Sequence, residues 1–76
     1  MIRKIKVRAV WDPEAGVWVA TSQAVPGLAT EADTIEGLLE RLKVIIPELL
    51  ELNGRLPGKE ITFQLVSERT EIARVV

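Results

Sequence analysis

A single long amphipathic stripe constrains the fold of this chain more than any other feature. Between residues 35 and 50, apolar side chains recur three positions or one position apart, which places them on one face of a helix. They are Ile35, Leu38, Leu39, Leu42, Ile45, Ile46, Leu49 and Leu50. Ordering a helix backbone costs about 1–2 kcal/mol per residue, so helix propensity alone does not hold such a segment. The stripe therefore requires a sheet to cover it.

The predicted helix begins with a capping signal. Asp33 is expected to accept hydrogen bonds from the first free backbone amides, and Glu36 three residues later completes a capping-box-like pair. Thr34 is an equally good candidate for the cap.

The second half of the helix contains a proline. Pro47 cannot donate a hydrogen bond to the carbonyl of Lys43, so we expect either one helix kinked near residues 43–47 or two short consecutive helices. Asn53 and Gly54 follow, and this pair suits a left-handed C-terminal cap.

Four other segments read as strands. Residues 2–11 alternate, with apolar side chains on one face and basic side chains on the other. Residues 17–22 carry apolar side chains on both faces, which predicts a central strand that is covered at least partly on both sides. Residues 28–30 predict a short third strand, and residues 60–66 alternate again as the last core strand. The turns between the first three strands are expected at Asp12-Pro13-Glu14-Ala15-Gly16 and at Val25-Pro26-Gly27.

These elements predict an α+β fold. We expect one β-β-β-α-β domain over residues 1–76, with an antiparallel sheet packed on one amphipathic helix and a core over residues 2–66. Residues 67–76 are ambiguous between a further edge strand, a strand added to a neighbouring subunit, and a partly disordered tail.

The composition limits how so small a domain is stabilised. The 76 residues include no cysteine and no histidine, so neither a disulfide nor a thiolate or imidazole metal site is available. Apolar residues make up 47% of the chain, more than a core of this size can hide. We therefore expect a homo-oligomer, a dimer or a tetramer.

The charges balance overall but are unevenly distributed. Ten basic and eleven acidic residues give a formal charge of −1, which provides no long-range attraction for nucleic acid or an anionic membrane. The first strand is basic, whereas the helix region is acidic. The acidic residues Glu31, Asp33, Glu36 and Glu40 are candidates for contact with a basic partner, and the alternative is a nucleic-acid surface at Arg3, Lys4, Lys6 and Arg8.

Catalytic chemistry is poorly represented in the sequence. Asp12 and Glu14 lie where a turn favours acids, and Asp33 and Glu36 lie where a helix start favours them. No nucleophile has a histidine base, and no phosphate-binding glycine loop is present. We expect no enzyme, no cofactor and no metal.

Targeting signals are also missing from the sequence. No apolar run approaches the length of a membrane span, and the N-terminal segment alternates charged and apolar residues unlike a signal peptide. A cytoplasmic protein is the expectation.

The ordered motifs over residues 3–66 resemble the HicB-like antitoxins, and among them the small DUF1902 group. A G-x-W-V-A strand leads to V-P-G-L-x-T-x-A-D-T and then to an acidic amphipathic helix. The residues that match the family pattern are Gly16, Trp18, Val19, Ala20, Val25, Pro26, Gly27, Leu28, Thr30, Ala32, Asp33, Thr34, Glu36 and Leu39.

The resemblance implies both a fold and a partner. It implies a β-β-β-α-β fold with a partial RNase H-like sheet that lacks nuclease residues, a dimer or tetramer, and binding to a small basic mRNA-cleaving toxin of the HicA type. Many HicB proteins also carry a C-terminal DNA-binding segment. About ten residues follow the last predicted core strand here, too few for a helix-turn-helix, so operator binding is not expected unless this segment pairs into a ribbon. The alternatives to an antitoxin are an orphan homo-oligomeric scaffold and the nucleic-acid-binding regulator described above.

Overall fold

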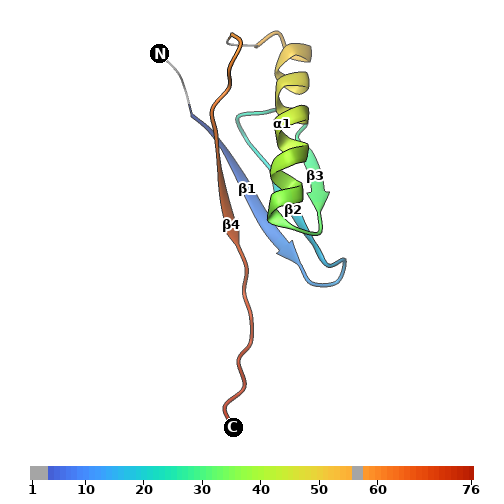
Figure 1. Ribbon diagram of the computed structural model, residues 1–76, viewed down its shortest axis with the longest axis vertical. Helices are drawn as coiled ribbons and strands as arrows, with labels where there is room; N and C mark the ends of the chain where they lie inside the picture. The colour runs from blue at the N-terminus through green and yellow to red at the C-terminus, as the bar shows by residue number, and fades with distance from the viewer. Residues whose placement is uncertain (1–3, 56–57) are drawn as a thin grey trace.

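The computed structural model describes residues 4–55 and 58–76 and contains five regular elements (Figure 1). In chain order they are β1 (Ile5–Asp12), β2 (Val17–Thr21), β3 (Ala29–Ala32), α1 (Ile35–Leu52) and β4 (Phe63–Glu68). The predicted α+β class and the β-β-β-α-β order are confirmed.

The four strands form one sheet in the order β3-β2-β1-β4. The β1–β2 and β2–β3 pairs are antiparallel, but β4 runs parallel to β1. The sheet is therefore mixed, and the expectation of an antiparallel sheet is wrong for its last strand. The reason is topological: α1 carries the chain from β3 across to the other edge, and parallel pairing requires such a crossover.

The strand limits shift by a few residues from the predicted ones. Strand β3 covers residues 29–32 rather than 28–30, and β4 covers residues 63–68 rather than 60–66. Strand β1 is described from residue 5 onward, so the predicted start at residue 2 lies outside the described residues. An alternating pattern identifies the buried face, whereas pairing with the neighbouring strand decides where each strand begins.

The predicted turn between β1 and β2 is present. The Asp12 carboxylate accepts hydrogen bonds from the amides of Glu14 and Ala15 at 3.0 and 3.3 Å. Gly16 closes the turn with a φ of +68°, a conformation that side-chain-bearing residues rarely adopt. Asp12 therefore holds the turn together, as the structural interpretation of this acid predicted.

Thr34, and not Asp33, caps the helix. The Thr34 backbone is extended, and its hydroxyl accepts a hydrogen bond from the Gly37 amide at 3.0 Å. Of the two predicted candidates, Asp33 is wrong because it lies one residue before the position from which a side chain reaches the third helical amide. A Cβ atom added at Gly37 would lie only 3.0 Å from the Thr34 hydroxyl.

The helix continues through Pro47 as one element to Leu52, so the alternative of two short helices is wrong. Its C-terminus has the predicted left-handed cap. The amide of Gly54 donates to the carbonyl of Glu51, and the amide of Arg55 donates to the carbonyl of Leu50 at 2.8 Å.

The core lies under one line of the predicted helix stripe. Leu38, Leu42, Ile46 and Leu50 are buried, while the flanking members of the stripe, Ile35, Leu39, Ile45 and Leu49, are half-buried. The sheet contributes small side chains to the same core, Ala9, Ala20 and Ala32, together with Val7. Alanines on the sheet allow the helix to approach closely.

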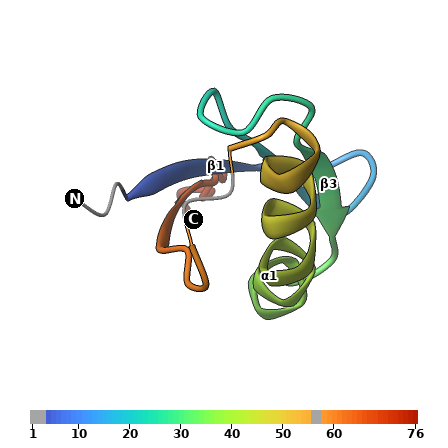
Figure 2. The same cartoon turned by 90° about the horizontal axis from the view of Figure 1, so that it is seen from above.

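The helix covers only one half of the sheet. Seen from above, α1 lies over the β3 side, and β1 and β4 extend beyond it (Figure 2). The strands nearest to α1 are β3 and β2. Apolar residues on the uncovered half of this face, Ile5, Phe63 and Leu65, remain partly exposed.

Beyond β4 the chain continues as an exposed tail, residues 69–76, that has no regular secondary structure. The tail projects past the end of the sheet (Figure 1), and the molecule measures 54 × 23 × 19 Å. Its radius of gyration is 14.4 Å. A compact domain of this length has a radius of gyration of about 11 Å. Of the alternatives for residues 67–76, residues 67 and 68 complete β4, and the rest form no strand within this chain.

Candidate protein-binding surfaces

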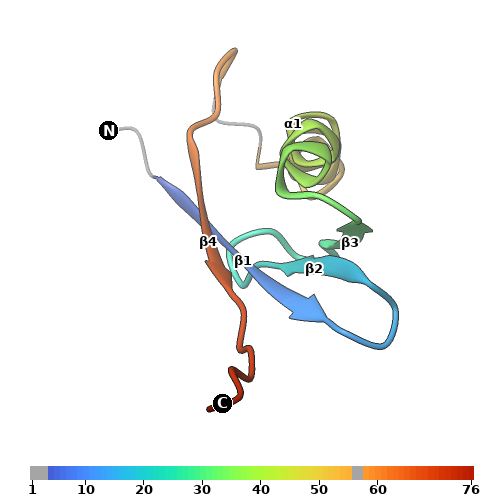
Figure 3. The ribbon, with the colours of Figure 1, turned by 60° about the horizontal axis from the view of Figure 1, so that its bottom comes forward.

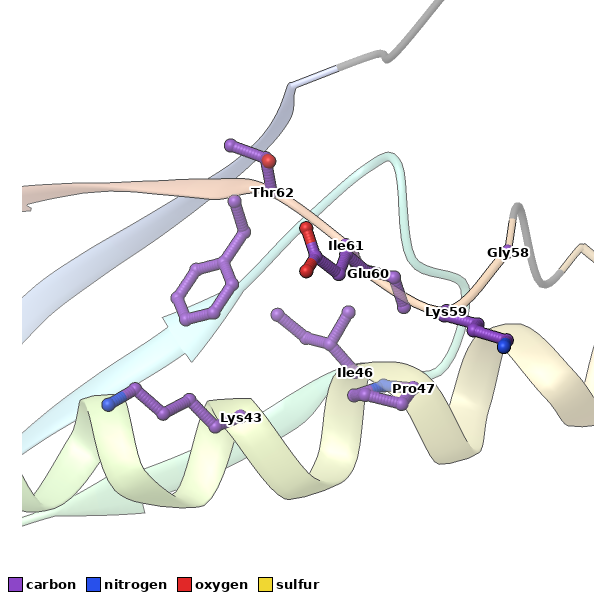
Figure 4. Close-up of a pocket in the computed structure, with 9 residues that line it drawn as sticks. Lys43, Ile46, Pro47, Gly58, Lys59, Glu60, Ile61 and Thr62 are labelled. Atoms are coloured by element: carbon purple, nitrogen blue, oxygen red, sulfur yellow. The ribbon is translucent and has the colours of Figure 1, made fainter.

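An open hollow of about 700 Å³ lies between α1 and the segment that leads into β4 (Figure 4). It exists because the helix stands over β2 and β3 and leaves the β4 side of the sheet uncovered. Ile46 and Pro47 form its helix side, while Ile61 and Phe63 form its sheet side. Lys43, Lys59 and Glu60 lie around it, so the hollow is apolar with a charged rim.

Two of the four predicted acidic residues lie on the same side of α1 as Lys43 and Pro47, nearer to the start of the helix than the residues that line the hollow. Glu36, Glu40, Lys43 and Pro47 are spaced four, three and four residues apart, which places them along one side of α1. Glu36 and Glu40 are exposed, and the Glu40 carboxylate accepts a hydrogen bond from the Lys43 ammonium group at 3.1 Å. Neither glutamate lines the hollow, and Glu40 adjoins it through its contact with Lys43.

The other two predicted acidic residues lie elsewhere. Glu31 is exposed on β3 and adjoins Arg41 in a separate shallow hollow on the edge of the sheet. Asp33 is exposed in the short connection before α1. The predicted acidic set is therefore divided, and only Glu36 and Glu40 lie on the side of α1 that carries Lys43 and Pro47.

The basic face of β1 is partly neutralised by β4. Lys4, Lys6 and Arg8 are exposed as predicted, and Arg3 lies outside the described residues. Arg8 donates two hydrogen bonds to the Glu68 carboxylate, at 2.6 and 3.2 Å. This ion pair holds the pKa of Glu68 below its usual value and the pKa of Arg8 above it. The pairing removes one cation from the surface that the nucleic-acid alternative requires.

Two tryptophans and an arginine form a cluster that the sequence interpretation missed. The rings of Trp11 and Trp18, on paired positions of β1 and β2, meet edge to face with centroids 5.3 Å apart. The Arg69 guanidinium lies 4.1 Å from the centre of the Trp11 ring. The signal was present in the alternation of β4, because continuing it by two residues beyond Ser67 places Arg69 on the same face as Phe63 and Leu65.

Metal and membrane sites find no support in the part of the chain that the structure describes. Within residues 4–55 and 58–76, no three acidic side chains gather closely enough to hold a metal ion. Among the same residues, no helix combines the length and apolar character needed to cross a bilayer.

Comparison with known proteins places this fold in a family. Comparison with the curated proteins found no match. A solved structure does match: the crystal structure of hypothetical protein TTHA1013 from the extremely thermophilic bacterium Thermus thermophilus. That protein is 53% identical over 96% of this chain and 100% of its own, with a TM-score of 0.72. The model of the family described as "Domain of unknown function (DUF1902)" matches residues 4–76, and the chain therefore belongs to the DUF1902 family.

Proposed function

We propose that this DUF1902 protein is a HicB-like antitoxin module that binds and neutralises a small, basic, mRNA-cleaving toxin of the HicA type. The observation that carries the proposal is that Glu36 and Glu40 lie on the side of α1 that carries Lys43 and Pro47, two residues of the hollow, and that Glu40 contacts Lys43. The rim of the hollow carries Lys43, Lys59 and Glu60, and the acidic part of the surface is the stretch of α1 before Lys43. An apolar hollow and a nearby acidic helix surface together complement a protein surface that bears both apolar and basic side chains.

The chemistry of such a partner follows from the two parts of this surface. Ile61 and Phe63 are half-buried, and removing their remaining apolar surface from water is favourable in free energy. This favours an apolar side chain from the partner in the hollow. Glu36 and Glu40 attract lysine or arginine side chains beside it, and Glu40 exchanges its contact with Lys43 for one with the partner. Capping the active surface of a ribonuclease requires this kind of contact, and it requires no catalytic group on the antitoxin.

The motif order over residues 3–66 adds to this argument, because it resembles the HicB pattern from Gly16 to Leu39. The nucleic-acid alternative is less well supported, because Arg8, one of the basic residues that it requires, is paired with Glu68. A cytoplasmic location belongs to the same proposal, since the proposed partner acts on mRNA.

The experiment co-expresses the full chain with a HicA-type toxin in bacteria and measures both growth and the purified complex. Glu36→Lys with Glu40→Lys should abolish the growth rescue and weaken binding by about tenfold or more at low salt, because two attractive charges become repulsive. The matched control is Glu14→Lys with Glu48→Lys, which changes the net charge equally at exposed positions, one in the turn between β1 and β2 and one on another side of α1 from Glu36 and Glu40. The control should bind and rescue like the natural chain.

Equal loss in both double variants would show that net charge alone governs binding, and would contradict the proposed surface. No complex and no rescue with the natural chain would contradict the proposed function, and would favour the alternative of an orphan homo-oligomeric scaffold.

A further inference from the structure

The open edge of β4 and the exposed tail that follows it have complementary features. Strand β4 pairs only with β1, so its other edge carries backbone groups without a strand partner within the described residues. The opposite edge of the sheet, β3, has only four residues, whereas β4 has six. The tail continues directly from β4 and presents Ile72, Val75 and Val76 to solvent, with Ile72 90% exposed.

We propose that β4 and the tail pair with the tail and β4 of a second copy of this chain. The two copies would be related by a two-fold axis perpendicular to the sheet, so that each tail becomes an antiparallel fifth strand beside the other copy's β4. Both helices then lie on the same side of a continuous sheet. This interface shares Phe63 with the hollow of the toxin contact proposed above, but the proposal of a dimer does not depend on that contact.

The backbone of β4 supports antiparallel pairing on this edge. The Ile5 amide donates to the Thr62 carbonyl at 3.0 Å, and Ile5 lies opposite Phe63 in the parallel register. In a parallel ladder this pattern turns the amides and carbonyls of Phe63, Leu65 and Ser67 away from β1, toward the open edge. If the tail keeps the same alternation, Glu71, Ala73 and Val75 present their backbone groups on that side as well.

Side-chain chemistry selects one register among those that the alternation allows. With the two-fold axis at Arg69, Phe63 lies opposite Val75, and Leu65 lies opposite Ala73, on the face that carries the helices. On the other face, Val66 lies opposite Ile72. Apolar side chains thus meet apolar side chains at these three positions. A shift of the partner by two residues would instead place Val66 opposite Arg74 and Glu68 opposite Ile72.

The start of the tail is already held in a direction that suits this pairing. Arg69 stacks on Trp11 and forms an ion pair with Glu71. The stacking directs the guanidinium group of Arg69 toward β1, and therefore away from the two-fold axis at which the Arg69 residues of the two copies would approach each other. Glu68 is held by Arg8 on the other face. These contacts lie on the two faces of the chain at the point where β4 becomes the tail, and Figure 3 shows the course of the backbone there. A preordered strand loses less entropy when it pairs.

Engineered cysteines test the register directly, because the natural chain has none. Val66→Cys with Ile72→Cys should produce covalent dimers under mild oxidation. In the proposed register these two positions form a non-hydrogen-bonded antiparallel pair, whose Cα atoms lie about 4.5 Å apart. Within one extended chain, six residues span about 20 Å, so a disulfide between these positions cannot form inside one molecule. The matched control, Val66→Cys with Arg74→Cys, should remain uncrosslinked.

Sedimentation equilibrium of the full chain tests the contribution of the tail. The natural chain should have about twice the 8.4 kDa mass of one copy at micromolar concentration. Ile72→Glu with Val75→Glu should raise the dimer dissociation constant at least tenfold, and both side chains are exposed in a single copy, so folding should be unaffected. The control Val44→Glu, at a helix position that is 60% exposed, should dimerise normally. A monomeric natural chain, a dimer that the tail variant leaves unchanged, or preferential crosslinking of the control cysteine pair would overturn the proposal.

Discussion

Removing the Leu42 side chain is the most direct test of how this small core is held together. Leu42 is fully buried at the middle of α1, in the same cluster as the alanines of the sheet. The alanine side chains of the sheet are too short to fill the space left by Leu42→Ala. The loss therefore includes both the transfer of the leucine side chain and an unfilled cavity, which together cost about 2–5 kcal/mol.

That cost is large compared with the total stability of the domain. A chain of 76 residues has a free energy of unfolding of about 4–11 kcal/mol at typical values per residue. A loss of about 3 kcal/mol should lower the melting temperature by about 12–24 °C, because a domain of this size loses about 4–8 °C per kcal/mol. The dependence of the unfolding free energy on urea concentration should keep its slope, since the surface exposed on unfolding is nearly the same.

Urea titrations followed by tryptophan fluorescence measure the difference in unfolding free energy. All variants are compared at one protein concentration, because the proposed dimerisation would add to the apparent stability. The control is Val44→Ala on the exposed side of the same helix, which should change the unfolding free energy by less than about 0.5 kcal/mol. A loss below about 1 kcal/mol for Leu42→Ala, or an equal loss for both variants, would refute the described core.

Two further predictions concern the ends of α1 and of β4. Thr34→Ala should cost about 1 kcal/mol in urea titration through the loss of the bond to the Gly37 amide, Thr34→Ser should retain most of it, and Asp33→Ala should change little. For Glu68, the pKa is lower in the folded chain than in the unfolded one, so its stabilising contribution is complete above its ordinary pKa near 4.5 and is lost as the pH falls through the folded pKa. When the pH is lowered from about 6 toward about 3, the melting temperature should therefore fall less steeply for Glu68→Gln than for the natural chain. Parallel curves for the two proteins would contradict the ion pair. The control is Glu48→Gln.

The sequence was sufficient to predict which faces of the strands and of the helix are buried, although not the limits of β3 and β4. Alternation in residues 5–11 correctly placed Val7 and Ala9 inside and Lys6 and Arg8 outside, because side chains on a strand must point to opposite faces. The spacing of leucines and isoleucines correctly predicted the helix and its buried side. Gly16 marked the end of its turn, since few other residues adopt its backbone conformation.

The pairing of strands far apart in the sequence could not be predicted from alternation. Alternation in β4 indicates which face is buried, but it does not indicate that the neighbour is β1 or that the two run parallel. The Arg8–Glu68 ion pair joins residues 60 positions apart, and it follows only once that pairing is known. The same limit applies to the candidate site: an acidic surface with Glu36 and Glu40 was predicted, whereas the hollow next to Lys43 and Pro47 depends on where the helix lies over the sheet.

The central claim is the proposal that a second copy of the chain covers the β4 edge and tail. Residue-resolved amide hydrogen exchange at millimolar and at sub-micromolar concentration tests it most directly. At high concentration the amides of Glu71, Ala73 and Val75 should be protected while those of Thr70, Ile72 and Arg74 exchange faster, and this alternation should disappear on dilution. Unprotected exchange throughout residues 70–76 at every concentration would contradict the claim.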